Sequence, residues 1–192
     1  MSKQEAVLVN TPFFIVNFPE VFTPKAFRDQ DPKYSLQMIF PKGTKGLKEF
    51  MATVRETIAK EYPKGPPASY KQPFRSGDKE GKKGIYEGAV FCTGSASGKN
   101  LPPGLIGPDN KPILDTTEFY SGCWAMAKVQ IWLNEFGASL QLRSIKKFKD
   151  GKKLFSHPSP EEDFRHVAGL ELPDGFEEEE EEMASSEYTF PF

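Results

Sequence analysis

Two tryptophans and a lysine share one face of a predicted strand in the last third of the chain. From Trp124 to Leu133 every second residue, beginning with Ala125, is apolar, which predicts a buried face. The opposite face carries Trp124, Lys128 and Trp132. Aromatic rings beside a cation are typical of a surface on which nucleic-acid bases stack, because every base has a π-face. The alternative is a second core, in which loops cover these tryptophans.

The next predicted strand adds positive charge. Arg143 lies on its polar face, and lysines follow within a short distance (Lys146, Lys147, Lys149, Lys152 and Lys153). Such a cluster beside aromatic residues could neutralise phosphates. A charged run is also compatible with an ordinary solvated face.

A second segment combines basic and aromatic residues in a long predicted loop between residues 64 and 84. A flexible segment of this composition could close over a flexible nucleic-acid strand. Tyr86 and Phe91 follow in a predicted strand on opposite faces, so at most one should be exposed. The candidate contacts of this region are Lys64, Tyr70, Lys71, Phe74, Arg75, Lys82, Lys83 and Tyr86.

Signals for enzyme chemistry are weak. The Gly94-to-Asn100 segment resembles a phosphate-binding loop, but it is one residue short and has Asn where Ser or Thr should meet Mg²⁺. His157 and His166 lack cysteine partners at ligand spacing, and Cys92 and Cys123 are expected to be buried free thiols. We therefore expect no catalytic residues, no metal site and no cofactor, and a protein that is not an enzyme.

The elements that position these residues are mostly strands. Strands are predicted over residues 6–18, 34–40, 85–93, 123–133 and 138–148, with long loops between several of them. A helix is predicted from Lys45 to Tyr62, capped by Thr44. This pattern predicts a mainly β, OB-fold-like five-stranded antiparallel barrel with one α-helix and long loops. The predicted helix follows the second strand, whereas an OB helix usually follows the third.

Charge divides the chain into two regions. Residues 1–160 contain 24 Lys and Arg against 15 Asp and Glu, whereas residues 171–192 contain nine acids and no base. The basic body indicates a nucleic-acid partner. The C-terminal segment is too acidic and too poor in apolar residues to fold. We predict a single-stranded DNA-binding domain over residues 1–165 and a disordered acidic tail over residues 166–192.

The tail ends in aromatic residues, Tyr188, Phe190 and Phe192. Tethered to a cationic groove, it would compete with DNA at high effective concentration. Its aromatic tip could dock in the chain's own groove, in the groove of a second copy to give a homodimer, or on a replication protein. An incidental acidic tail is the alternative.

Neither a signal peptide nor an apolar run long enough to span a bilayer is apparent, so we expect a cytoplasmic protein.

The segment Tyr120-Ser121-Gly122-Cys123-Trp124, followed by an alternating strand and a basic strand through Lys147 to Gly151, resembles a family of phage OB-fold single-stranded DNA-binding proteins. The resemblance extends from the N-terminal strand to about Phe164. It implies coating of single-stranded DNA in the infected host cell during replication, recombination and repair. It also implies recruitment of polymerase, primase-helicase or nuclease through the tail.

Two other functions remain open at this point. A protein-interaction scaffold acting through its acidic, aromatic-tipped tail would bind DNA weakly even without that tail. An RNA-binding OB protein would discriminate matched DNA and RNA oligomers through the 2′-hydroxyl.

Overall fold

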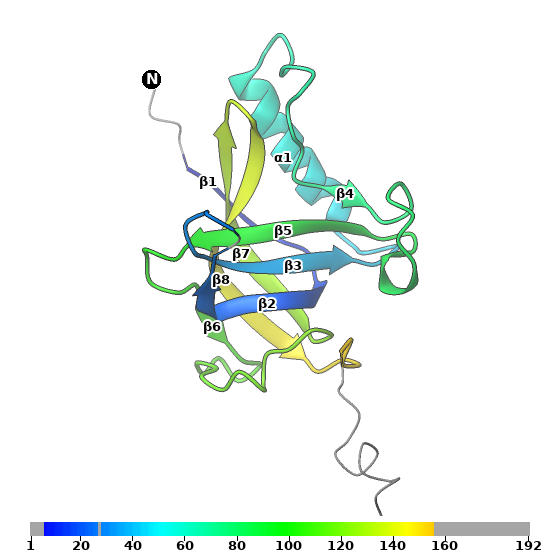
Figure 1. The fold of residues 1–192 in the computed structure, drawn as a ribbon. Coiled ribbons are helices and arrows are strands. Elements are labelled where there is room, and N and C mark those ends of the chain that lie inside the picture. Colours follow the sequence, from blue (N-terminus) through cyan, green and yellow to red (C-terminus); the bar gives the residue numbers. More distant parts are fainter. Residues whose placement is uncertain (1–5, 27, 156–192) are drawn as a thin grey trace, which may run out of the picture. The chain divides into compact units, whose positions relative to one another are not determined.

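The computed structural model describes residues 6–26 and 28–155 of the chain (Figure 1). The elements, in chain order, are β1 (Val7–Asn10), β2 (Phe14–Lys25), β3 (Lys33–Phe40), α1 (Leu47–Glu61), β4 (Arg75–Ser76), the 3₁₀ turn η1 (Gly84–Tyr86), β5 (Val90–Ser97), β6 (Gly104–Ile106), β7 (Trp124–Asn134) and β8 (Gly137–Lys149). The predicted tail, and the predicted domain boundary at residue 165, lie outside the described residues.

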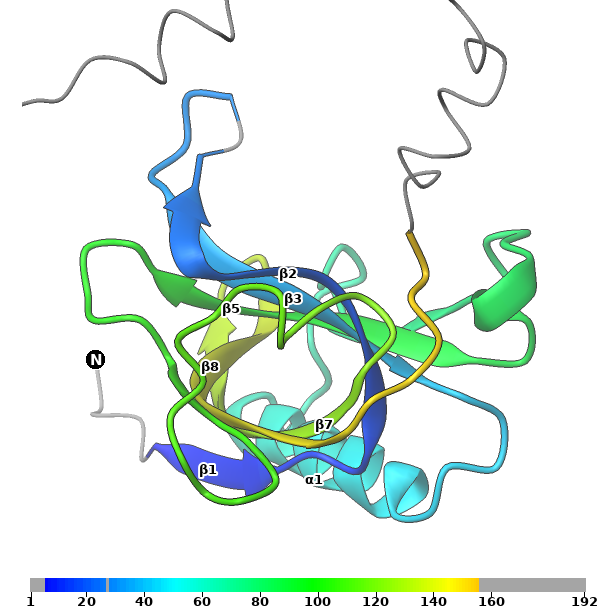
Figure 2. The ribbon, with the colours of Figure 1, turned by 90° about the horizontal axis from the view of Figure 1, so that it is seen from below.

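Five strands close into a barrel. Strand β7 pairs with β2, β2 with β3, β3 with β5, β5 with β8, and β8 again with β7, and Figure 2 shows these strands arranged as a ring. The predicted five-stranded barrel with one helix is confirmed. Four of the five pairings are antiparallel as predicted. The closing pair, β5 with β8, is parallel and joins Gly94 to Leu140 and Ser95 to Gln141.

The alternation in β7 and β3 builds the core. Every second residue of β7 from Ala125 to Leu133 is buried, as predicted. Tyr34, Leu36 and Met38 of β3 are buried as well. Because successive side chains of a strand point to opposite faces, the residues between them lie on the outside of the barrel.

Helix α1 follows the second barrel strand, β3, as the order of predicted elements indicated. It packs Phe50, Val54 and Ile58 into the core. The predicted cap is wrong, because the helix begins after Gly46, whose φ of 79° favours glycine, while the Thr44 hydroxyl donates to the Pro41 carbonyl.

The N-terminal prediction merged two strands and ended too early. Residues 6–18 form β1, which pairs with β7, and the first part of β2, which continues to Lys25. An irregularity lies between Asn17 and Glu20, where Phe18 has a φ of 46°. A bulge of this kind accommodates Pro19 within a strand, which a periodicity argument does not anticipate.

The third barrel strand is displaced from its predicted position. Residues 84–86 form η1, and β5 runs from Val90 to Ser97 through residues predicted as loop. Position 94 of this strand favours glycine, because a β-carbon there would lie only 2.7 Å from the Leu142 side chain. The segment that resembled a phosphate-binding loop therefore begins as a barrel strand.

Candidate nucleic-acid interface

A row of large side chains crosses the outside of the barrel. Cα pairing joins Trp124 on β7 to Ile15, Ile15 to Ile39, Ile39 to Phe91, and Phe91 to Arg75 on β4. Ile39 and Phe91 are buried, and with Ile15 they belong to a small cluster separate from the main core. This outer row gives the barrel an apolar surface outside its core.

The segment of residues 75–88 folds back over the outer row. The ring of Tyr86 meets the ring of Phe91 edge-on, with centroids 5.2 Å apart. The Lys82 ammonium lies 4.8 Å from the Tyr86 ring centre, and the Arg75 guanidinium 4.9 Å from that of Phe91. Three predicted site residues thus meet in one place. We call Arg75, Lys82, Tyr86 and Phe91 the Tyr86 cluster.

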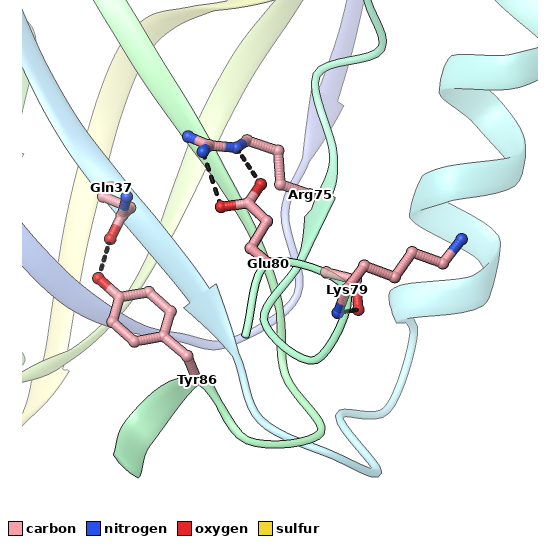
Figure 3. A network of polar contacts seen from close by, with 6 residues as sticks. Gln37, Arg75, Lys79, Glu80 and Tyr86 are labelled. Carbon is pink, nitrogen blue, oxygen red and sulfur yellow. Dashed lines mark hydrogen bonds and ion pairs between the residues drawn. The ribbon is translucent and has the colours of Figure 1, made fainter. Parts of the chain in front are cut away.

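Tyr86 is anchored to the barrel by hydrogen bonds, of which Figure 3 shows the one to Gln37 on β3. The buried Asn17 amide donates to Tyr86 Oη at 2.7 Å and to Gln37 Oε1 at 3.1 Å. The Tyr86 hydroxyl in turn donates to Gln37 Oε1 at 2.5 Å. Burial raises the pKa of Tyr86, while the hydrogen bond from Asn17 acts in the opposite direction. The hydroxyl therefore keeps its proton at neutral pH and remains a donor.

The two cations of the Tyr86 cluster differ in their partners. Arg75 makes a double contact with Glu80, at 2.5 and 2.7 Å, which partly balances its charge (Figure 3). No carboxylate of the described residues lies within ion-pair distance of Lys82. Lys82 is therefore the cation here whose charge is more available to a phosphate.

A polar groove lies where β5 meets β8. Trp132, 45% exposed, and Arg143 line it together, so two more predicted site residues are neighbours. Arg143 donates to Gln130 Oε1 at 2.5 Å, which holds its guanidinium near the sheet. We call this feature the Trp132 groove. Its other lining residues include Lys33, Ser95, Ser97, Asn100, Ser139 and Gln141.

Strand β5 links the two features. Phe91 belongs to the Tyr86 cluster, whereas Ser95 and Ser97 line the Trp132 groove. Thr93, between them on the same face, is exposed. At about 3.3 Å per residue, Phe91 and Ser95 are separated by about 13 Å along the strand. An extended strand of nucleic acid could therefore contact both features along one face of the barrel.

Trp124 and Lys128 contribute to other parts of the outside surface. Trp124 is half-buried at the β7 end of the outer row, with the Lys149 ammonium 5.4 Å from its ring centre. The exposed Lys128 lines a second groove with Lys146 and Phe148. The structure thus does not gather all the predicted outward residues of β7 into one site.

Three predicted contacts are partly or fully buried. Tyr70 is buried and packs against Tyr62, and Phe74 packs edge-on against Phe50 of the core. Lys147 is only 7% exposed. The burial of Tyr70 and Lys147 corrects the prediction that these two side chains form part of an exposed interface, whereas the partly buried Phe74 also lines a surface groove with Arg75 and Lys79.

Lys147 has a structural role instead. Its ammonium donates to the Glu118 carbonyl at 2.5 Å and pairs with Asp150 at 2.7 Å. This contact and a hydrogen bond from Tyr120 lower the pKa of Asp150. Lys147 lies on the core side of β8, as Ile145 does. A regular alternation that starts at Leu140 would place Lys147 on the outer side. A register shift between β7 and β8 reverses this.

The remaining predicted cations are exposed but dispersed. Lys64 follows helix α1, Lys71 bridges to Gly137 near the β7–β8 turn, and Lys83 precedes η1. The predicted tail contacts Tyr188, Phe190 and Phe192 lie outside the described residues.

Sequence reasoning missed Asn17, Gln37 and Phe18. The polar residues Asn17 and Gln37 interrupt otherwise apolar strands, which was the available signal for an outward polar row. Phe18 is 54% exposed and stacks on Phe155, with ring centres 5.2 Å apart. No sequence pattern brings these two phenylalanines together, because they are separated by most of the domain.

The described residues contain no group of three or more His, Cys, Asp or Glu side chains arranged to hold a metal ion. Within the same part of the chain, no helix is long and apolar enough to cross a membrane. Both cysteines are buried and unpaired with each other, and burial raises the pKa of each thiol.

A family model built around the single-stranded DNA-binding protein of Enterobacter phage Enc34 matches residues 7–182. The chain belongs to this phage family. The matched region includes every element of the barrel and both features of the outside surface. Among curated protein sequences, none matches the chain significantly.

Solved structures of phage proteins share the fold. The Enc34 single-stranded DNA-binding protein with a C-terminal truncation is 22% identical, with a TM-score of 0.65, over 77% of this chain and 88% of that one. The Enc34 protein in complex with single-stranded DNA is 21% identical, with a TM-score of 0.64, over 81% and 96%. The bacteriophage T7 protein gp2.5, also a single-stranded DNA-binding protein, is 13% identical, with a TM-score of 0.59, over 82% and 100%.

Proposed function

We propose that this chain binds single-stranded DNA without sequence specificity and coats it during phage DNA replication, recombination and repair. The observation that carries the proposal is the outer face of the barrel, where the Tyr86 cluster and the Trp132 groove lie along one strand. Membership of the Enc34 family supports it, as does the shared fold of an Enc34 protein solved with single-stranded DNA.

Base stacking supplies one part of the proposed affinity. Trp132 offers an exposed ring beside Arg143, and the Tyr86 ring is held in place by Asn17 and Gln37. Stacking contributes roughly 1–3 kcal/mol per base and tolerates any sequence. Rings that are fixed before binding lose less conformational entropy when a base stacks on them.

Backbone charge supplies the other part. Lys82, Arg75, Lys33 and Arg143 lie in the two features and can neutralise phosphates. Their contribution should weaken as salt rises, since the release of counterions into a more concentrated salt solution gains less entropy.

The acidic tail completes the proposal. It competes with DNA for the cationic face, and its aromatic tip recruits polymerase, primase-helicase or nuclease, or a second copy of the chain. The protein then acts in the cytoplasm of the infected host cell by binding rather than by catalysis.

Titration of a fluorescent oligo-dT with the full chain across a salt series tests the central claim. We expect binding that quenches tryptophan fluorescence and weakens steeply with salt. Trp132→Ala should lower the affinity about tenfold, within the range for loss of one stacking contact.

Leu114→Ala is the matched control, because Leu114 is 86% exposed and lies in neither feature. It should leave the affinity unchanged. Negligible binding of wild-type protein at low salt would refute the DNA-binding proposal. Wild-type affinity in Trp132→Ala would refute the stated role of the groove.

A further inference from the structure

The side-chain amide of Gln37 is locked in one orientation. The Phe18 backbone N–H donates to Asn17 Oδ1 at 3.1 Å, so the Asn17 amide nitrogen faces Gln37. That nitrogen and the Tyr86 hydroxyl both donate to Gln37 Oε1. A reversed Gln37 amide would direct its own N–H groups at the Asn17 donor and lose the hydrogen bond from Asn17. The oxygen is therefore held on the inner side of this network.

The Gln37 amide nitrogen has no partner within the described residues. None of the hydrogen bonds found there uses Nε2. Among the fully buried side-chain nitrogen and oxygen atoms of this part of the chain, Tyr70 Oη alone lacks a hydrogen-bond partner, so Nε2 is not one of those fully buried atoms. Nε2 is therefore not fully buried, and solvent can reach it. Nε2 offers two donor hydrogens. The acceptor of the same amide, Oε1, is already occupied by Asn17 and Tyr86.

This donor pair lies on the proposed interface. Gln37 pairs across the sheet with Asn17 on one side and with the exposed Thr93 on the other. The next pairs along the same strands include Ile39 with Phe91 of the outer row. Because the Tyr86 hydroxyl donates to Gln37, a base stacked on the Tyr86 ring would have the Gln37 side chain beside it.

We propose that Gln37 is a further DNA-contacting residue that donates hydrogen bonds to an oxygen acceptor of the bound strand. This inference rests on the proposed function. The acceptor is a carbonyl oxygen of a stacked base or a phosphate oxygen of the backbone. With a base as the source, the contact favours thymine, which presents two carbonyl oxygens, over adenine, which presents none. Two flanking residues, Asn17 and Tyr86, act as positioning residues that keep the donors outward.

The test compares Gln37→Glu with the wild-type full chain. Glutamate keeps an oxygen for Asn17 and Tyr86 but replaces the two donors by an acceptor. Affinities are measured for oligo-dT, oligo-dA and an equally long strand carrying abasic sites. We expect about a tenfold loss on oligo-dT and a much smaller loss on the other two strands, which identifies a base carbonyl. An equal loss on all three strands identifies a phosphate oxygen and also supports the donor contact.

Two control variants separate the donor contact from charge. Ala59→Glu adds the same charge on the exposed side of helix α1 and should bind as wild type does. Thr93→Glu adds it directly beside Gln37, and any loss from simple repulsion should fade as salt rises. The loss in Gln37→Glu should persist across the salt series. Melting temperatures of all variants show that the fold is retained.

The contrary outcomes are distinct. Wild-type affinity of Gln37→Glu on every strand overturns the inference, and so does a loss that fades with salt in parallel with Thr93→Glu. In both cases the proposed function stands, because the wild-type chain still binds oligo-dT. Failure of the wild-type chain to bind oligo-dT refutes the proposed function itself.

Discussion

Lys82 and Lys147 are the same residue type in two different environments. The Lys82 ammonium lies over aromatic rings on the outside of the barrel, whereas that of Lys147 is enclosed by the Glu118 carbonyl and Asp150. Both were predicted as phosphate contacts because both fall in basic runs. Local density of charge does not show which face of a strand a lysine occupies, and here a register shift in β8 decides it.

The two lysines should therefore respond differently to substitution. Lys82→Ala should weaken oligo-dT binding and reduce the slope of log affinity against log salt by about 0.7, the value for one phosphate contact on a single strand. Lys147→Met should leave that slope unchanged and lower the free energy of unfolding by about 1–2 kcal/mol, since Glu118 and Asp150 lose a charged partner. Salt-series titrations and urea denaturation measure the two effects. An unchanged slope in Lys82→Ala would exclude that lysine from the interface.

At the scale of elements, the segment of residues 75–88 depends on a glycine for its place on the barrel. Gly77 N–H donates to the Ala89 carbonyl, and a β-carbon at Gly77 would lie 1.9 Å from the Tyr86 carbonyl oxygen. Backbone atoms cannot move aside as a flexible side chain can. The close packing at Gly77 therefore positions the turn that carries Tyr86.

Gly77→Ala should displace this turn and lower oligo-dT affinity by about tenfold or more, because Tyr86 and Lys82 lose their positions on the outer row. Gly81→Ala is the matched control. Gly81 lies in the same segment, with a φ of 64° and open space around it. The substitution should therefore lower the free energy of unfolding by only about 1 kcal/mol through backbone strain, and leave the oligo-dT affinity unchanged. Equal affinities of the two variants would show that the docked turn does not matter for binding.

Sequence periodicity predicted the regular elements well and the irregular ones poorly. Strands β3, β7 and β8 and helix α1 have strong alternation or helical spacing, and each was found near its predicted bounds. Strand β2 passes through an irregularity at Phe18, and β5 carries Gly94 and small polar residues. Both look like loops in sequence because their conformations depend on tertiary packing.

The sequence also predicted part of the candidate interface. Strand alternation and the clustering of basic and aromatic residues identified Arg75, Lys82, Tyr86, Trp132 and Arg143, and the structure places them in two linked features. Asn17 and Gln37 were missed, since their importance arises from hydrogen bonds with Tyr86, which is distant from both in the chain. Tyr70 was misassigned because an aromatic residue in a loop can pack inward as readily as outward.

At the scale of the whole molecule, opposite charges are carried by different regions of one chain. Residues 1–160 have an excess of basic residues, while residues 171–192 are strongly acidic. A tethered polyanion raises the local concentration of negative charge near any cationic face. On the proposed competition by the tail, DNA displaces this polyanion when it binds.

A chain ending at Leu170 should therefore bind oligo-dT more tightly than the full chain. The difference should shrink as salt rises, because screening weakens the competing interaction. Replacing the acids of residues 177–182 with serine in the full chain should reproduce the gain, which distinguishes charge from tail length. Equal affinities of the three proteins at low salt would contradict tail competition.

The parallel pairing of β5 with β8 has a consequence for how the barrel forms. This closure joins residues that are more than forty positions apart, through only two paired positions, whereas the β7–β8 hairpin is local. Long loops are costly to close before their contacts form. We therefore expect the hairpin to assemble early and the closure at Gly94 to assemble late. The backbone amides of the β5–β8 pairing should then be the first amides of the barrel to exchange with deuterium.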